Sequence, residues 1–236
     1  MGIPFGRIGI LGFGVACAIL FAPGSASAQE GGFGRSPVVS VGLERVGGVS
    51  YSKLTADNSD DSASLTAFGL GSVNVNPYTA PRLGIDYISP VGVTVGGGLG
   101  FGHFSLSTKN GSRSEDQGSL TVYTFTPRIG YRIPVGPRFD LTPRAGVTFA
   151  GGKLSDGNSD ASNGVFAVAL SGEAVGTIRL TPSFNILTGL GFDHTVHAST
   201  SSTRSSSGGG TSTNTDDIKG ALFTAQLWLG VGGYFN

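Results

Sequence analysis

Two short histidine-containing triplets are the first places in the sequence where a reaction could occur. His103-Phe104-Ser105 places an imidazole and a hydroxyl two residues apart, and Glu115 follows in the next polar segment. A serine nucleophile needs a base within hydrogen-bond reach and an acid that orients this base. The triplet supplies only the spacing, and His197-Ala198-Ser199 repeats it, so the pattern has little specificity. We therefore expect an interfacial histidine on a strand end and a protein that is not an enzyme.

Metal and phosphate binding have equally weak support. His194 and His197 are three positions apart, so on a regular strand they point to opposite faces and make a poor pair of metal ligands. The acidic segment 57–61 lacks the turn glycine and the closing glutamate that a calcium loop requires. The glycine triplets at 96–98 and 208–210 do not open a helix, as a phosphate site would need. We expect no metal and no cofactor.

Charged side chains are the more informative group, because they recur on one face of alternating segments. Period-two alternation sends five carboxylates and five arginines to the polar faces: Glu44, Asp86, Asp140, Glu173 and Asp193, with Arg82, Arg128, Arg132, Arg144 and Arg179. Arg45 is the exception, because it follows Glu44 directly and alternation sends it outward. Either Arg45 extends to a membrane interface, or the register of the first strand differs from simple alternation.

Three of these arginines share a P-R-x-G motif, at 81–84, 127–130 and 143–146. Each lies six or seven residues from a short turn, which places it roughly 15 Å above that end of a tilted strand. We predict a charge layer across a lumen, formed by Arg82, Arg128, Arg144, Glu173 and Asp193, above a lower set of Asp86, Arg132, Asp140 and Arg179. The layer could simply fill an interior that is only just wide enough for side chains, or it could act as a gate.

Eight alternating segments must position these charges. They lie near 38–53, 80–89, 92–107, 120–133, 138–153, 164–179, 184–198 and 218–236. Most exceed the roughly 9–11 residues that cross a bilayer as a tilted strand. The segment 65–79 is also strand-like and could be the upper half of the second strand. Because Pro127 and Pro143 would each remove a ladder hydrogen bond, we expect bulges there.

Two kinds of connection alternate strictly between these segments. Long polar stretches cover 55–64, 109–119, 155–163 and 199–217, and short Pro/Gly turns lie at 89–92, 134–137 and 180–183. The low-complexity stretch 199–217 is expected to be disordered.

Aromatic residues on the apolar faces gather at two heights. Near the short turns lie Tyr87, Tyr131, Phe139, Phe184 and Phe235, and further up lie Phe101, Tyr123, Phe149, Phe192 and Phe223. This distribution is typical of the aromatic girdles of a membrane barrel.

The N-terminus reads as an export signal. One arginine, Arg7, precedes an apolar run from 8 to 22, and Ala26-Ser27-Ala28 offers a cleavage site. We expect a signal peptide at 1–28, a short linker at 29–37 and a barrel domain at 38–236. The single cysteine, Cys17, falls within the signal, so the mature chain can form no disulfide. A formal net charge of +0 gives no electrostatic footprint for nucleic acid.

The last segment completes the pattern. From 221 to 235 its odd positions are mostly apolar, its even positions are mostly small or polar, and Phe235 precedes only Asn236. An export signal, eight alternating segments, alternating loop lengths and this aromatic end resemble the small outer-membrane β-barrel superfamily of the OmpA, OmpX and OmpW type. The resemblance implies an all-β fold, an eight-stranded antiparallel transmembrane β-barrel with up-and-down order in the cell outer membrane. It also implies contact with outer-membrane lipid and with the barrel-assembly machinery through the last strand. We expect a monomer.

Three functions remain open at this point. The first is a structural or small-solute barrel whose Arg–carboxylate layer fills or gates the lumen. The second is a surface adhesion or interaction protein that uses its long outer loops. The third is a lipid-modifying enzyme, because His103 and Ser105 on a lipid-facing strand faintly resemble the site of outer-membrane lipid A deacylases.

Overall fold

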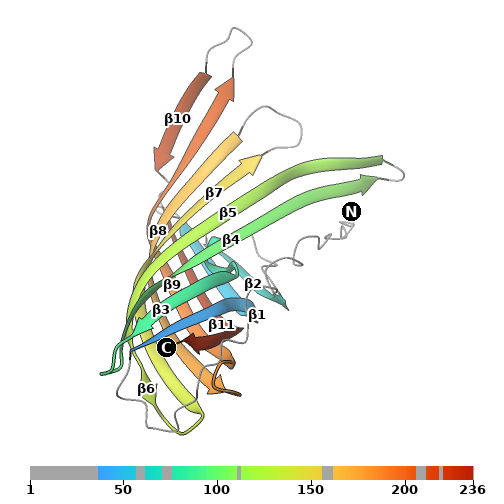
Figure 1. Cartoon of the computed structure of the whole chain (residues 1–236). Coiled ribbons are helices and arrows are strands. Elements are labelled where there is room, and N and C mark those ends of the chain that lie inside the picture. The colour runs from blue at the N-terminus through green and yellow to red at the C-terminus, as the bar shows by residue number, and fades with distance from the viewer. Residues whose placement is uncertain are drawn as a thin grey trace.

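The computed structural model describes residues 37–56, 62–70, 76–110, 113–155, 162–205, 211–217 and 220–235. Within these ranges the chain forms one antiparallel sheet that closes on itself (Figure 1). Its elements are β1 (Val38–Ala56), β2 (Ser62–Leu70), the 3-10 helix η2 (Pro77–Thr79), β3 (Arg82–Ile88), β4 (Val93–Asn110), β5 (Arg113–Tyr131), β6 (Ile133–Pro134), β7 (Phe139–Ser155), β8 (Ser162–Arg179), β9 (Asn185–Ser205), β10 (Thr211–Asp217) and β11 (Gly220–Phe235).

The barrel closes between its first and last strands. β1 pairs with β11 from Val39↔Phe235 to Ala56↔Gly220, and β11 pairs with β9 on its other side. The circuit β1, β3, β4, β5, β7, β8, β9 and β11 joins each strand to an antiparallel neighbour. The predicted eight-stranded up-and-down β-barrel is confirmed.

The second strand of the barrel is divided into two pieces. β3 pairs with the lower half of β1, up to Glu44↔Arg82, and β2 pairs with the upper half, from Gly47↔Leu70 to Thr55↔Ser62. The segment 65–79 therefore supplies part of an upper strand, up to Leu70. Residues 76–81 form a turn directly before β3, and we call it the inner turn.

The connections at one end are short, whereas the strands at the other end extend into long hairpins that diverge (Figure 1). β4 and β5 remain paired as far as Asn110↔Arg113, and β9 and β10 pair from Ser199↔Asp217 to Ser205↔Thr211. The expectation of disorder across 199–217 is wrong for the described residues on both sides of 206–210. Serine and threonine form regular β ladders when a partner strand satisfies their backbone groups.

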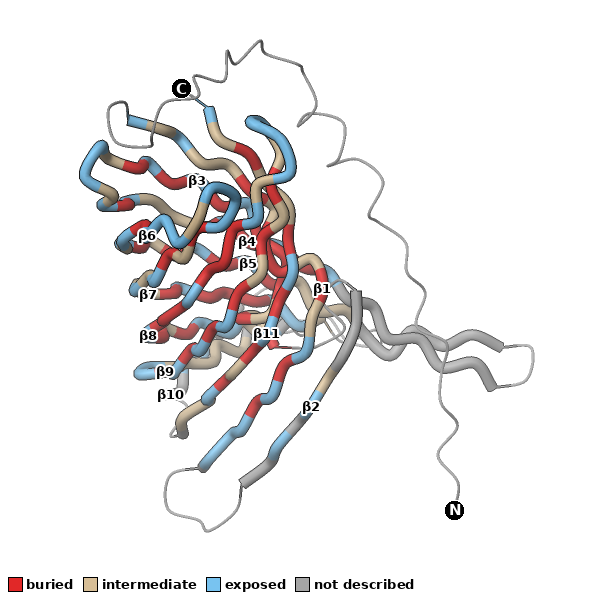
Figure 2. The backbone as a smooth tube through the Cα atoms, turned by 90° about the horizontal axis from the view of Figure 1, so that it is seen from below, coloured by how far each residue is buried: buried red, intermediate tan, exposed pale blue. Residues whose placement is uncertain are grey.

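Burial alternates along the strands, as Figure 2 shows in red and pale blue. The pattern in β3 is strictly alternating from Arg82 to Ile88. Nine of the ten predicted girdle aromatics are exposed on the outer face, and Phe184 is half-buried. The outer face is therefore apolar, and the polar residues of the same strands line the lumen.

The two prolines within strands do not produce the expected bulges. The register between β5 and β7 is the same at Phe125↔Phe149 and at Arg128↔Gly146, so no residue is inserted around Pro127. The ladder instead omits the pairs at 126 and 127, because proline has no N–H to donate. Pro143 pairs in register with Ala174 of β8 and lies beyond the last β5–β7 pair, Gly130↔Arg144.

The predicted signal peptide at 1–28, the linker up to 36 and the acidic segment 57–61 lie outside the described residues. No helix in the described ranges is long and apolar enough to cross a membrane.

Candidate functional site

Glu44 on β1 is shared by arginines from three other strands. Its carboxylate accepts hydrogen bonds from Arg82 Nε at 2.7 Å, from Arg128 Nη1 and Nη2 at 2.7 and 2.9 Å, and from Arg144 Nη1 at 2.9 Å. The three arginines are those of the P-R-x-G motifs. The structure therefore brings them to one acceptor, which is a carboxylate outside the sequence-predicted layer.

Asp86 extends this arrangement. Arg128 donates from Nε and Nη2 to the two oxygens of Asp86, both at 2.8 Å, while its other bonds go to Glu44. Arg144 Nη2 lies 3.3 Å from Asp86. The Arg128 guanidinium is therefore held between two carboxylates in a forked, charge-assisted geometry. Asp86 was expected in the lower set, and the structure places it in contact with the layer above.

Glu173 and Arg45 form the other side of the same group. Arg82 Nη2 donates to Glu173 at 2.5 Å, and Arg45 Nη2 donates to it at 2.7 Å. Arg45 is 5% exposed and lies in the lumen, so the prediction from alternation, which placed it on the outer face, is wrong. A β-bulge between Leu43 and Gly47 causes the difference, because it inserts extra residues on β1 and places Arg45 at φ 59°, in the left-handed region. Glu44 and Arg45 can then both point inward.

Asp193 joins this group only at its edge. Its nearest arginine is Arg45, at 3.5 Å, and it does not bond the three motif arginines. Ser171 Oγ donates to Asp193 at 2.5 Å, and Gln226 Nε2 donates at 3.3 Å. We call the whole set the central charge cluster: Glu44, Arg45, Arg82, Asp86, Arg128, Arg144, Glu173 and Asp193. It contains four arginines and four carboxylates, so it is formally neutral.

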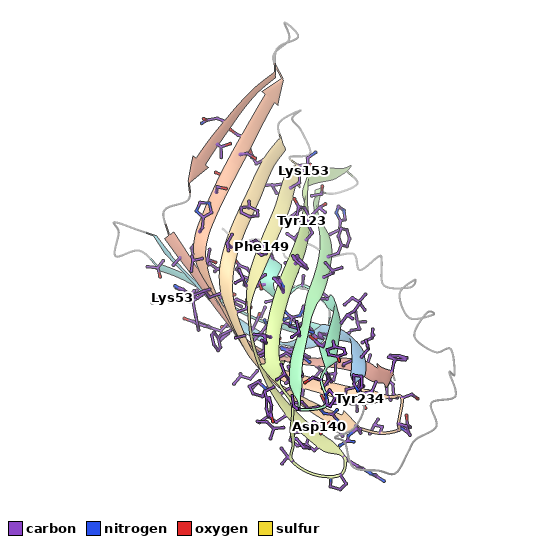
Figure 3. All side chains as sticks on the ribbon, turned by 60° about the vertical axis from the view of Figure 1, so that its left-hand side comes forward. Lys53, Tyr123, Asp140, Phe149, Lys153 and Tyr234 are labelled. Carbon is purple, nitrogen blue, oxygen red and sulfur yellow. The ribbon has the colours of Figure 1, made fainter. Side chains whose placement is uncertain are left out.

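A smaller group lies closer to the short turns, and we call it the lower charge cluster: Arg132, Asp140 and Arg179. Arg132 Nη2 donates to Asp140 at 2.8 Å, and Arg179 Nη2 lies 3.3 Å from the same carboxylate. The Arg132 guanidinium also stacks 4.8 Å from the ring of Tyr234. Asp140 and Tyr234 lie together at this end of the barrel (Figure 3).

A small apolar layer separates the two charge clusters. Val175, Leu187 and Trp228 pack together inside the lumen and are at most 5% exposed. The indole of Trp228 lies over Gly189, where any added Cβ would clash with the ring. Trp228 and Gln226 both face the lumen, as the alternation of the last strand predicts. The packing of Val175 and Leu187 against Trp228 was not predicted.

The inner turn covers the central charge cluster from above. Asn76 Nδ2 donates to Ser52 Oγ and Thr224 Oγ1, both at 2.7 Å, which fixes the turn to β1 and β11. The Tyr78 carbonyl accepts from Arg45 and, at 3.4 Å, from Gln226.

The Tyr78 side chain completes this closure. The ring is 1% exposed and packs against Ala150, Ala167 and Ala169, and its hydroxyl lies 2.9 Å from Thr195 Oγ1. The Asn-Pro pair at 76–77 is a turn signal that could have located the turn. Nothing local in the sequence indicates that the turn folds inward.

Together these layers close the lumen with partnered charges. Glu44, Arg82, Asp140 and Asp193 are each at most 2% exposed. Removing one member of such a group leaves its partner charged and without compensation, which typically costs about 3–5 kcal/mol. The arrangement is suited to filling space and to holding strands at a fixed separation. Displacing it requires several bonds to break together.

Of the three candidate catalytic residues, the structure describes only the side chain of His103. His103 Nδ1 lies 2.9 Å from Thr121 Oγ1 on the neighbouring strand, and the Ser105 side chain lies outside the described part. His194 and His197 do not point to opposite faces as predicted. A bulge pairs them with Leu170 and Val168, two residues apart, and both are exposed on the outer face. Among the described residues, no three His, Cys, Asp or Glu side chains form a group that could hold a metal ion.

Comparison with known proteins shows which solved structures have a similar fold. No protein-family profile and no curated protein sequence matches the chain. Among solved structures, a major outer membrane protein from Thermus thermophilus is similar over 85% of this chain and 100% of its own, with 14% identity and a TM-score of 0.51. The chain has the fold of the small outer-membrane β-barrels. At this identity the likeness establishes the fold alone.

Other outer-membrane barrels are also similar. Ail, the attachment invasion locus protein of Yersinia pestis, matches at 15% identity and a TM-score of 0.42, over 85% of this chain and 99% of its own. The protease OmpT from Escherichia coli matches at 8% identity and 0.38, over 86% and 97%. The fold does not decide whether the chain is an enzyme. The apolar outer face and the barrel fold place the protein in the outer membrane.

Proposed function

We propose that this outer-membrane barrel is a structural protein whose lumen stays closed to small solutes at rest. The observation that carries the proposal is the sharing of Glu44 by Arg82, Arg128 and Arg144, which ties four strands together across the lumen. The inner turn lies above this point, and the apolar layer and the lower charge cluster lie below it. A solute would have to displace all of these layers, and the proposed role requires no catalysis.

Planar-bilayer recording of the refolded protein tests this closure. The native chain is expected to give no steady current. Replacing Arg128 by alanine removes the guanidinium that lies between Glu44 and Asp86, and the space it leaves can fill with water. We expect current steps to appear in this variant. Arg138→Ala is the matched control, because Arg138 is exposed beside a short turn and should leave the barrel silent. Steady currents from the native protein would contradict the proposal.

A second role as an interaction protein is favoured by the outer hairpins. β9 has 21 residues and β4 has 18, whereas roughly 9–11 residues cross a bilayer. The excess forms paired, polar ribbons beyond the membrane. These ribbons offer paired backbone and a sequence rich in serine and threonine to a partner.

Deletion of residues 200–216 separates the two roles. This change removes the upper β9–β10 ribbon and leaves the β9–β11 pairs from Phe223↔His194 to Gly232↔Asn185. We expect the barrel to fold normally and the attachment of expressing cells to a test surface to fall. The matched control is a deletion of 155–162 at the β7–β8 tip. Unchanged attachment after the first deletion would rule out the interaction role for this ribbon.

A further inference from the structure

Two of the three P-R-x-G motifs pair with each other, on the neighbouring strands β5 and β7 (Figure 1). In this antiparallel register Arg128 lies directly opposite Gly146, and Arg144 lies directly opposite Gly130. Each motif therefore places its arginine opposite the glycine of the other. Such reciprocal pairing requires the same spacing of arginine and glycine in both strands, and the shared motif supplies it.

The arginine of the third motif faces glycine in the same way. Arg82 lies directly opposite Gly100 on β4. Gly98, two residues away on the lumen face of β4, lies under the stem of the same arginine. A Cβ added at Gly98 would fall 3.0 Å from Cδ of Arg82 and 3.2 Å from its Nε. Each motif arginine is therefore set against bare backbone of a neighbouring strand.

The glycines of the paired motifs stand where a larger residue would collide with the opposite strand. A Cβ added at Gly130 would fall 2.5 Å from the carbonyl oxygen of Pro143 and 2.9 Å from the stem of the arginine opposite. A Cβ at Gly146 would meet the carbonyl oxygen of Pro127 and the stem of its own opposite arginine. Cβ atoms in proteins are essentially never closer than 3.0 Å to a non-bonded heavy atom. The proline and the arginine of one motif therefore occupy the space that the glycine of the other leaves.

The glycine of the first motif, Gly84, lies under the centre of the central charge cluster. A Cβ at this position would fall 2.6 Å from Nη2 of Arg128 and 2.7 Å from Oε1 of Glu44. These two atoms form a hydrogen bond of 2.9 Å. The interior of an eight-stranded barrel is only just wide enough for its side chains. An alanine at position 84 would therefore compete for space with the bond itself.

We propose that these glycines, which we call the contact glycines, are positioning residues of the central charge cluster: Gly84, Gly98, Gly100, Gly130 and Gly146. They let the arginine stems and the bond between Glu44 and Arg128 lie against bare backbone, so that three guanidinium groups can reach one carboxylate in a narrow lumen. P-R-x-G is then a self-complementary pairing unit, in which the arginine of one strand fits over the glycine of its neighbour. This role is independent of whether the lumen conducts.

A double-mutant cycle at Gly84 tests the proposal on the refolded full chain, with urea unfolding followed through Trp228. Gly84→Ala should raise the unfolding constant of the native chain about ten-fold, as overpacking of a filled interior does. In the Glu44→Asp background the carboxylate is one methylene shorter and is withdrawn from Gly84. The same alanine should then raise the unfolding constant by about two-fold or less.

Gly98→Ala repeats the test with a different partner. Its effect should fall in the same way in the Arg82→Ala background, because the stem that the new methyl group contacts is then absent. Gly191→Ala is the matched control, since Gly191 lies on the lumen face opposite Glu173 and an added Cβ would make only ordinary contacts, at 3.4 Å or more. This control should change the unfolding constant by about two-fold or less in every background.

Two results would overturn the proposal. The first is an equal effect of Gly84→Ala in the native and Glu44→Asp backgrounds, which would mean that the glycine acts on the backbone alone. The second is an effect of Gly191→Ala as large as that of Gly84→Ala. Heat-dependent gel mobility shows which variants fold, and the Glu44→Asp cycle decides alone if Arg82→Ala does not. Steady currents from the native chain would contradict the closed lumen and leave these cycles unchanged.

Discussion

Replacing Glu44 by alanine is expected to destabilise the barrel more than any other single substitution of a lumen charge. The change leaves Arg82, Arg128 and Arg144 facing one another without their shared acceptor. An uncompensated buried charge typically costs about 3–5 kcal/mol, and Glu44 compensates three of them. Trp228 is the only tryptophan of the chain and is buried below this cluster, so its fluorescence reports unfolding in urea directly.

Glu44→Gln is the matched control for that experiment. The amide keeps the volume and one acceptor oxygen but removes the negative charge. Its loss of stability should lie between those of the native chain and the alanine variant. If alanine at 44 lowered the free energy of unfolding by no more than a typical surface substitution, about 0.5 kcal/mol, the shared acceptor would not be a structural requirement.

Replacing Tyr78 by alanine should have the second largest effect. The ring fills a space bounded by Ala150, Ala167 and Ala169, whose small side chains cannot move into the cavity left behind. Large-to-small substitutions of buried aromatic residues cost about 3–5 kcal/mol. Because β2 and β3 pair with β1 independently of this ring, circular dichroism should show unchanged strand content. Urea unfolding followed through Trp228 measures the loss.

Tyr78→Phe isolates the hydroxyl from the ring. It removes the bond to Thr195 and preserves the packing, so a loss of about 1 kcal/mol is expected. Equal losses in the two variants would mean that the ring contributes nothing beyond its hydroxyl. The inner turn would then be held by Asn76 and by the Tyr78 carbonyl alone.

Local alternation was sufficient to predict the barrel and most of its lumen. Arg82, Arg128 and Arg144 lie at nearly equal distances in sequence from short turns. Because the short turns lie at one end of a closed barrel, residues at equal distances from them lie at about the same height in the lumen. Their meeting at one point follows from that geometry. Asp193 also faces the lumen but lies at the edge of the cluster, where its partners are Ser171, Gln226 and Arg45.

Arg45 and the inner turn could not be predicted in this way. A bulge reverses the alternation for the residues it inserts, and its location depends on strand pairing with distant parts of the chain. The adjacent charges of Glu44 and Arg45 were the signal of an irregular register. Tyr78 finds its partners on β7, β8 and β9, more than seventy residues away, so no local pattern specifies its inward position.

Because the second strand is divided, the lower and upper halves of the wall differ in how their strands are paired. Below Gly100 each strand of the eight-strand circuit has a neighbour on both sides, and ion pairs of three arginines with Glu44 connect the strands across the lumen. Above it, the described part of β4 pairs only with β5, and β2 pairs only with β1. A seam therefore runs down the outer half of the wall. The wall can therefore deform at its outer end, while the ion pairs across the lumen keep the diameter of its base constant.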